Sequence, residues 1–284
     1  MKKVRYIAYI FAAVCIFSTA AHAATPPTLT AKGLAVYGWK DGIATPVLVK
    51  NEHRLYTIAS ITKLITAKTV EDLYKPEDII TISKSAAATE GTTPGIVAGA
   101  QFSRDDLLKA LLISSSNDAA SAFMETAGKT EFLKKMNSIL HMNNYTSTSF
   151  VNPSGLDPAK KLVANTNRMT PYHLSILLND IYNHDDLLRD IMSKDSAEIT
   201  NLTTNTPVLL KQTNALYRDE NYKDKVLMSK TGLTNLAGQN LAFIAPGNDT
   251  YEYMTVVFLG SKSRNVDSKK IIDWLDITYQ NFGG

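Results

Sequence analysis

A serine and a lysine lie three residues apart, at Ser60 and Lys63. On a helix, residues three apart share a face, so the Ser60 hydroxyl and the Lys63 amine are expected to meet. Serine is a weak nucleophile until a base takes its proton, and a lysine serves as that base when burial or a second cation lowers its pKa. A backbone N–H at a helix start also points outward, so Ser60 can supply an oxyanion-hole donor. Alone the pair is weak, because about one such match is expected by chance.

A second motif, Lys230-Thr231-Gly232, follows a β-prone run. Its lysine and threonine offer a cation and a hydroxyl to an anionic group, and its glycine lets a substrate backbone approach closely. A chance match is expected in roughly one chain in ten. A surface lysine at a strand end is the simpler interpretation of the motif taken alone.

The third candidate is the polar stretch Ser114-Ser115-Ser116-Asn117-Asp118. In a turn, the Ser115 hydroxyl and the Asn117 carboxamide, two residues apart, point into one cleft. Ser115 is then placed to pass a proton, and Asn117 to orient both a lysine and a substrate amide. A polar loop between two helices is the simpler interpretation of this stretch by itself.

The elements that must position these motifs follow from hydrophobic periodicity and turn residues. A strand pair is expected from Leu34 to Val49 around a Lys40-Asp41-Gly42 turn. A helix is expected from about Ser60 to Tyr74, ended by Lys75-Pro76. The chain from about residue 77 to residue 190 reads as mostly helical, with helix starts capped by Ser103 and by Thr170 before Pro171.

Strand signals return late, and a terminal helix follows them. The late β-prone runs are residues 206–211, 226–229, 241–245 and 254–259, and the helix carries Ile271, Trp274, Leu275 and Thr278. Since both ends of the chain are strand-rich, we infer one sheet built from about residues 30–58 and 200–284. A helical subdomain of about residues 75–190 is inserted between these two parts.

The first 23 residues are typical of a secretory signal. Cations at Lys2, Lys3 and Arg5 precede an apolar run, and Ala21-His22-Ala23 offers small residues to a signal peptidase. An uncleaved anchor is the alternative, but the run is short for a bilayer. We expect cleavage to leave residues 24–284 as one exported domain without a transmembrane segment, in the periplasm or cell-wall space.

Removal of this segment changes the charge and the cysteine content. The segment holds three of the 30 basic residues and none of the 27 acidic ones, so the remainder has 27 of each and gives no indication of nucleic-acid binding. Cys15, the only cysteine, also lies in it. The histidines that remain form no close metal-binding pair: His53, His141, His173 and His184. We therefore expect no disulfide, no metal and no cofactor.

Taken together, and in the chain order Ser60-x-x-Lys63, Ser115-x-Asn117 and Lys230-Thr231-Gly232, the three motifs resemble those of penicillin-recognising serine enzymes. The resemblance is strongest to the low-molecular-mass penicillin-binding proteins, which are D-alanyl-D-alanine carboxypeptidases and related endopeptidases. It covers about residues 30–260 and extends to flanking stretches, namely residues 58–67, 106–113, 117–120, 150–156 and 230–234 with Ala237-Gly238. The resemblance implies a mixed α/β (α+β) fold of the β-lactamase/transpeptidase type, with an antiparallel sheet flanked by helices and an inserted all-helical subdomain.

The resemblance also implies a role for each motif residue. Ser60 is the nucleophile, Lys63 the base that accepts its proton, and Ser115 the relay to the leaving amine. The substrate-binding residues are Asn117, Lys230, Thr231 and Gly232, with the backbone N–H groups of Ser60 and Leu233 forming the oxyanion hole. Ser114 and Ser116 are then helix-end or turn residues that should tolerate alanine.

The implied substrate is the peptidoglycan stem peptide, cleaved in cell-wall remodelling, with β-lactam antibiotics as covalent inhibitors. Carboxypeptidase activity is the main expectation, and endopeptidase cleavage of D-Ala-containing cross-links is the alternative. A β-lactamase is a rival, but one large class of those enzymes adds a glutamate between the second and third motifs, and none occurs between Glu131 and Glu198. A non-catalytic peptidoglycan-binding homologue is the other rival.

The sequence departs from the family pattern at three places. Some members have a histidine where Leu233 stands, and an acidic residue often occupies the position of His173. The chain also stops after one terminal helix, which matches the short members without the β-rich second domain.

Overall fold

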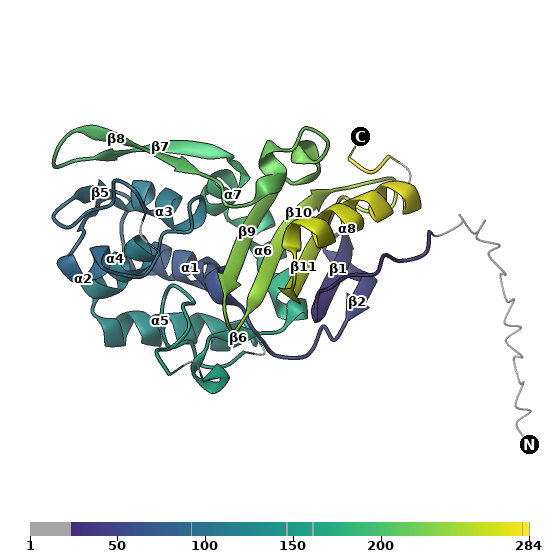
Figure 1. Cartoon of the computed structure of the whole chain (residues 1–284), viewed down its shortest axis with the longest axis horizontal. Helices are drawn as coiled ribbons and strands as arrows, with labels where there is room; N and C mark the ends of the chain where they lie inside the picture. Colours follow the sequence, from purple (N-terminus) through teal and green to yellow (C-terminus); the bar gives the residue numbers. More distant parts are fainter. Residues whose placement is uncertain (1–23, 92, 146, 161, 280, 284) are drawn as a thin grey trace, which may run out of the picture.

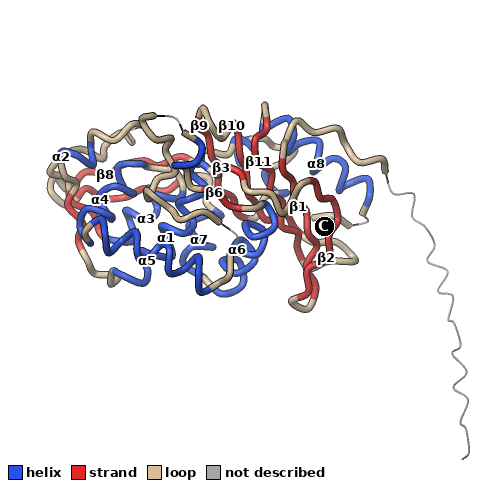
Figure 2. Tube along the Cα trace, turned by 90° about the horizontal axis from the view of Figure 1, so that it is seen from below, coloured by secondary structure: helices blue, strands red, loops and turns tan. Residues whose placement is uncertain are grey.

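The computed structural model describes residues 24–91, 93–145, 147–160, 162–279 and 281–283, so the expected signal segment lies outside it. Figure 1 shows a sheet with helices on both of its faces, beside a mainly helical region. Figure 2, from a perpendicular direction, shows α1 to α5 gathered at one end of the molecule and the strands β1, β2, β10 and β11 at the other, with α8 beside them. Within the described part, no helix is both long enough and apolar enough to cross a membrane.

The central sheet has five antiparallel strands in the order β2-β1-β11-β10-β9. Their bounds are β1 Gly33–Lys40, β2 Ile43–Lys50, β9 Met228–Thr234, β10 Gly238–Pro246 and β11 Tyr253–Ser261. Pairing of β1 with β11 joins the two ends of the chain, with Gly33 opposite Leu259. Strand β9, which carries Lys230-Thr231-Gly232, therefore lies at one edge of the sheet.

The inner strands of the sheet are buried on both faces because a helix covers each face. Helix α8 (Arg264–Thr278) packs on one face and α6 (Pro171–His184) on the other. Side chains of a strand alternate between faces, so in β1 Leu34 and Val36 join the apolar cluster on the α8 side, whereas Ala35 joins the cluster on the α6 side. This arrangement explains the nearly continuous apolar runs of the inner strands.

The remaining elements form the mainly helical region and its connections. The helices are α1 Lys63–Leu73, α2 Lys84–Ala87, α3 Arg104–Leu112, α4 Asn117–Ala127, α5 Lys129–Met142 and α7 Asp186–Ser193. The short 3₁₀ turns are η1 Ala59–Thr62, η2 Val163–Asn165, η3 Ala215–Arg218 and η4 Lys223–Lys225. The paired strands outside the central sheet are β3 Tyr56–Thr57 with β6 Arg168–Met169, β4 Ile79–Thr81 with β5 Gln101–Ser103, and β7 Ser196–Asn201 with β8 Thr206–Lys211.

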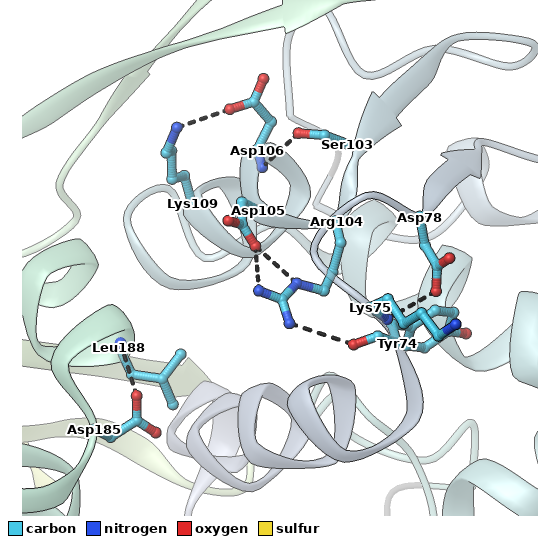
Figure 3. Close-up of polar contacts among 10 residues, drawn as sticks. All are labelled: Tyr74, Lys75, Asp78, Ser103, Arg104, Asp105, Asp106, Lys109, Asp185 and Leu188. Atoms are coloured by element: carbon cyan, nitrogen blue, oxygen red, sulfur yellow. Dashed lines mark hydrogen bonds and ion pairs between the residues drawn. The ribbon is translucent and has the colours of Figure 1, made fainter.

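The expected helix caps are present. Ser103 Oγ accepts a hydrogen bond from the Asp106 N–H, and Thr170 Oγ1 accepts one from the His173 N–H. Next to the first of these caps, the buried Arg104 side chain donates to the Tyr74 carbonyl oxygen and contacts the Asp105 carboxylate (Figure 3). The start of α3 is thereby tied to the end of α1, the helix that begins at Lys63.

The expected mixed fold with an antiparallel sheet flanked by helices is confirmed, and four details differ from expectation. A 3₁₀ turn precedes α1, so the helix begins at Lys63 rather than Ser60. Strand β9 begins at Met228 rather than at residue 226, and it contains the Lys-Thr-Gly motif, which was expected to follow the strand. Strand β8 pairs with β7, which the sequence pattern did not indicate, in a separate hairpin. The inserted region is mainly helical but includes the short β4–β5 pair, because pairs of two or three residues leave almost no periodic signal.

Candidate active site

The three motifs meet where the edge strand β9, the η1 turn and the start of α4 come together. Lys63 Nζ lies 2.8 Å from Ser60 Oγ, 2.7 Å from Asn117 Oδ1 and 3.0 Å from the Ser154 carbonyl oxygen. Ser60 is only partly buried, whereas the Lys63 side chain is 0% exposed. The hydroxyl is thus accessible to a substrate while the amine behind it is shielded from water.

Burial lowers the pKa of Lys63 well below its ordinary value, the Lys230 cation lowers it further, and the Asp118 carboxylate opposes both effects. The Lys63 amine donates to Ser60 Oγ, Asn117 Oδ1 and the Ser154 carbonyl oxygen. In the neutral amine, two N–H groups serve Asn117 and Ser154, and the lone pair is then free to accept the proton of the Ser60 hydroxyl. The geometry therefore suits a serine nucleophile with a lysine as its base.

Lys230 connects the third motif to the second. Its Nζ donates to Ser115 Oγ at 2.8 Å and to the Thr231 carbonyl oxygen at 3.2 Å, and its side chain is fully buried. Burial, followed by the Arg264 cation, lowers the pKa of Lys230 to about 7. Arg264 comes from the start of α8, and its Nη1 lies 3.4 Å from the Gly232 carbonyl oxygen. These two cations make this end of the site positive.

Ser115 is positioned by a tight turn between α3 and α4. Its backbone φ is 60°, in the left-handed region that non-glycine residues seldom adopt and that is often found at functional sites. Ser116 Oγ then caps α4 by accepting from the Ala119 N–H at 3.1 Å, and Asn117 begins the helix. Ser116 is fully buried, and alanine would leave that N–H without its acceptor, so the structure leads us to expect a loss of stability from Ser116→Ala rather than tolerance.

Two glycines fix the turn that carries Ser60. A Cβ at Gly155 would lie 1.9 Å from the Ala59 carbonyl oxygen, and a Cβ at Gly232 would lie 2.7 Å from the Ile58 carbonyl oxygen and 3.3 Å from the Ser60 nitrogen. Ala59 itself has a φ of 49°. The backbone before the nucleophile is thus held between the residue 152–156 turn and strand β9.

The turn at residues 152–156, which the sequence indicated, supplies a contact that sequence reasoning missed. Asn152 Oδ1 accepts from the Ser154 N–H at 3.2 Å and from the Gly155 N–H at 2.6 Å. This geometry directs the Ser154 carbonyl to Lys63. A backbone acceptor of this kind has no signature in residue types.

Thr213 is a second contact that sequence reasoning missed. It follows β8, and its hydroxyl is hydrogen-bonded to that of the buried Thr231. No short motif marks Thr213, since its contact with Thr231 depends on the β7–β8 hairpin, which returns the chain to β9.

Leu233 is the next residue along β9 after Gly232. It has 60% of its surface exposed, so its side chain lies outside the core.

Leu233 lines a groove of about 440 Å³ next to these residues. Its lining combines loop residues and the end of β9, namely Glu90, Leu156, Asp157, Pro158, Ala159, Leu233, Thr234 and Asn235. The Glu90 carbonyl oxygen also accepts from Asn117 Nδ2 at 2.6 Å. One wall of the groove is thus hydrogen-bonded to Asn117, which contacts Lys63. In the described residues, no group of three or more His, Cys, Asp or Glu side chains is arranged to hold a metal ion.

Sequence comparison relates the chain to enzymes of one kind. Residues 21–262 match the family model of D-alanyl-D-alanine carboxypeptidases. A D-alanyl-D-alanine endopeptidase of Haemophilus influenzae is 35% identical over 191 residues, which are 66% of this chain and 61% of that protein. The D-alanyl-D-alanine carboxypeptidase DacD of Salmonella typhimurium is 27% identical over 88% of this chain and 63% of its own length. The chain thus spans less than two thirds of the length of these relatives.

Structural comparison finds a solved protein with the same fold as this chain. Penicillin-binding protein D2 of Listeria monocytogenes, in its ampicillin-bound form, superimposes with a TM-score of 0.73 over 89% of this chain and 99% of that one. The two sequences are 22% identical, so this likeness shows a shared architecture.

Proposed function

Because the chain belongs to the D-alanyl-D-alanine carboxypeptidase family, we propose that it is a serine-type D-alanyl-D-alanine carboxypeptidase that cleaves peptidoglycan stem peptides through an acyl-enzyme on Ser60. The observation that carries this proposal is the buried Lys63 amine 2.8 Å from Ser60 Oγ. In this role the protein acts in cell-wall remodelling.

In the acylation step, Lys63 takes the Ser60 proton and Ser60 Oγ bonds to the carbonyl carbon of the penultimate D-alanine. The backbone N–H groups of Ser60 and Leu233 stabilise the oxyanion. The carbon–nitrogen bond then breaks, and the leaving amine takes a proton through Ser115, which is hydrogen-bonded to Lys230. Water hydrolyses the resulting ester and regenerates the serine.

The substrate binds along the free edge of β9. Its terminal carboxylate meets Lys230 and Thr231, where the nearby Arg264 adds positive charge. Gly232 allows close approach of the substrate backbone, since its position has no side chain. The second hydrogen of the Asn117 amide nitrogen, the first being donated to Glu90, is available to the substrate amide.

Endopeptidase activity is the second candidate function. The 35% identical relative is named a D-alanyl-D-alanine endopeptidase, and both activities use the same acylation chemistry on different leaving groups. Discrimination between them requires purified protein to be incubated with a pentapeptide muropeptide and, separately, with a cross-linked dimer. Release of free D-alanine from the first supports the carboxypeptidase, and monomers from the second support the endopeptidase.

Export to the periplasm or cell-wall space belongs to the same proposal, since its substrate lies outside the cytoplasmic membrane. The expected signal segment at residues 1–23 supports it. β-Lactams should acylate Ser60 and be released slowly, because the glutamate that one class of β-lactamases uses for deacylation is missing between Glu131 and Glu198. Rapid hydrolysis of a chromogenic cephalosporin would contradict this part of the proposal.

Covalent labelling by a fluorescent penicillin tests the chemistry directly. Ser60→Ala should abolish labelling and leave the circular dichroism spectrum unchanged. Ser114→Ala removes a hydroxyl that donates to the Ala110 carbonyl oxygen, and this variant should be labelled normally. Labelling of Ser60→Ala at the rate of the unmodified protein would refute the assignment of the nucleophile.

A further inference from the structure

A carboxylate without an evident function lies next to the proposed catalytic residues. Asp118 stands in the first turn of α4, directly after Asn117, and its side chain is 0% exposed. Its Oδ2 accepts a hydrogen bond from the Thr93 N–H at 2.6 Å. Its Oδ1 is buried and has no hydrogen-bond partner in the described part of the chain.

Burial of such a group is costly. An ionised carboxylate loses its hydration in the interior, and an unpaired oxygen adds to the penalty. Burial raises the pKa of Asp118, while the Thr93 N–H and the Lys63 charge lower it. A small apolar residue would fill this position at lower cost, so the carboxylate calls for a role that offsets its burial.

The hydrogen bonds of Asn117 and Asp118 indicate the geometric part of that role. Asn117 Nδ2 holds the Glu90 carbonyl and Asp118 Oδ2 holds the Thr93 N–H, each at 2.6 Å. Between these two contacts, Gly91 has a φ of 78° and packs so closely that a Cβ there would lie 2.9 Å from Asn117 Nδ2. Two consecutive side chains of α4 thus attach the same segment at two points.

This attachment fixes the orientation of the Asn117 amide. With Nδ2 committed to the Glu90 carbonyl, Oδ1 faces Lys63 Nζ at 2.7 Å. If the segment moved away, the amide would lose the partner that distinguishes its two ends. In the flipped orientation an N–H of the amide would face Lys63 Nζ, and the lone pair of the neutral amine would be directed at the amide instead of at the Ser60 hydroxyl.

The charges around Lys63 indicate a second, electrostatic part of the role of Asp118. Lys63 on α1 faces Lys230 on β9, and Arg264 on α8 lies close to Lys230. Asp118 on α4 is the acidic group whose charge acts on Lys63. Glu90, at the mouth of the groove, is exposed to solvent, where screening weakens its effect.

We propose that Asp118 is a positioning residue for the acylation step: it holds the segment carrying Glu90 and Thr93 against Asn117, and its charge balances that of the buried lysines. This inference rests on the proposed chemistry of Ser60 and Lys63. Asp118 touches neither substrate nor Ser60, so it acts through Asn117 and through the charge state of Lys63.

Two substitutions separate the two parts of the role. Asp118→Asn keeps an oxygen that accepts from the Thr93 N–H but removes the charge, and Asp118→Ala removes both. The measurement is the second-order rate constant of acylation by a fluorescent penicillin across the pH range, with thermal unfolding recorded in parallel. Asp185→Asn is the matched control, because Asp185 is also a buried aspartate that accepts from a backbone N–H, that of Leu188 (Figure 3), and its carboxylate pairs with Lys68 rather than with Lys63.

Asp118→Asn should retain its maximal rate within about threefold, while the acidic limb of its pH profile moves to lower pH, since loss of the negative charge further lowers the pKa of Lys63. Asp118→Ala should lose on the order of tenfold or more in maximal rate. Asp185→Asn should leave the profile in place. An unshifted pH profile in Asp118→Asn would overturn the electrostatic part of the proposed role. A normal maximal rate in Asp118→Ala would overturn the geometric part.

The asparagine variant keeps the test decisive if the alanine variant does not fold. The outcome is also distinct from failure of the proposed function. If the unmodified protein is not labelled by penicillin, the proposed function fails. If it is labelled and both Asp118 variants behave like it at every pH, only the present inference fails.

Discussion

Gly155 lies against Ala59 so closely that a Cβ on the glycine would stand 1.9 Å from the Ala59 carbonyl oxygen. The contact joins a turn more than ninety residues away in sequence to the residue before the proposed nucleophile. Since Gly155 also has a φ of 79°, both its backbone conformation and its missing side chain are needed there. The position of Ser60 thus depends on a residue that takes no part in the chemistry.

Gly155→Ala should be strongly destabilising and should reduce penicillin labelling. Gly99→Ala is a matched control, because Gly99 has a similar φ of 83° and a Cβ added there would meet no other atom within 4 Å. Both variants carry the left-handed backbone strain of about 1–2 kcal/mol, and Gly155→Ala adds a steric cost of about 1–3 kcal/mol. Denaturant unfolding measures the difference. Equal stabilities for the two variants would contradict the close contact with Ala59.

Ser116→Ala should lower the free energy of unfolding by about 1 kcal/mol, because it removes the N-cap of α4. The neighbouring Ser114→Ala is the control, since the Ser114 hydroxyl bonds to the Ala110 carbonyl within the preceding helix and caps no N–H. Thermal or urea unfolding of the two variants compares them directly. A Ser116→Ala variant as stable as the Ser114→Ala variant would show that the cap does not contribute.

The rate of cleavage of an anionic peptide should have a bell-shaped pH dependence. The base Lys63 must be neutral, so kcat/KM rises as pH increases through its lowered pKa. Lys230 must be charged to hold the terminal carboxylate, and its pKa is about 7 in the free protein, so kcat/KM falls as pH increases through that region. Arg264→Gln removes the cation that lowers the pKa of Lys230, and should move the alkaline limb to higher pH. An alkaline limb that stays in place would argue against Lys230 as the carboxylate-binding group.

Glu71→Gln should stabilise the protein at alkaline pH. Burial, then its hydrogen bond to Asp185, raises the pKa of Glu71 from 4.5 to about 8. The stability that its proton contributes is fully present below the unfolded pKa and is lost as pH rises through about 8. The glutamine stays neutral, so its advantage should grow between these values to on the order of 1 kcal/mol, given the partial exposure of Glu71. Unfolding free energies of both proteins across this range provide the check, and a constant difference would contradict the shifted pKa.

The resemblance to penicillin-recognising serine enzymes, which rests on three short motifs, implied the convergence of Ser60, Lys63, Ser115, Asn117 and Lys230. A strand leading to Lys230 and the caps at Ser103 and Thr170 were also predictable, since local residue types determine them, but the continuation of that strand through the motif was not. The Ser154 carbonyl and Thr213 were not, because their contacts depend on how distant segments pack. Asp118 belongs to the polar stretch that the sequence singled out. Its burial, and hence the free-energy cost of burying its carboxylate, is a property of the folded chain alone.

The pairing of β1 with β11 has a consequence for the order of events during synthesis. Strand β1 is among the first elements made, yet its partner Leu259 follows Gly33 by most of the chain. Pairing across such a long separation closes a large loop, which slows folding and leaves apolar strands unprotected while they wait. The nascent chain therefore passes most of its synthesis without the completed central sheet. Ser60 and Lys63 are made early, but their neighbour Lys230 arrives only with the last strands, so the proposed site cannot assemble before synthesis is nearly finished.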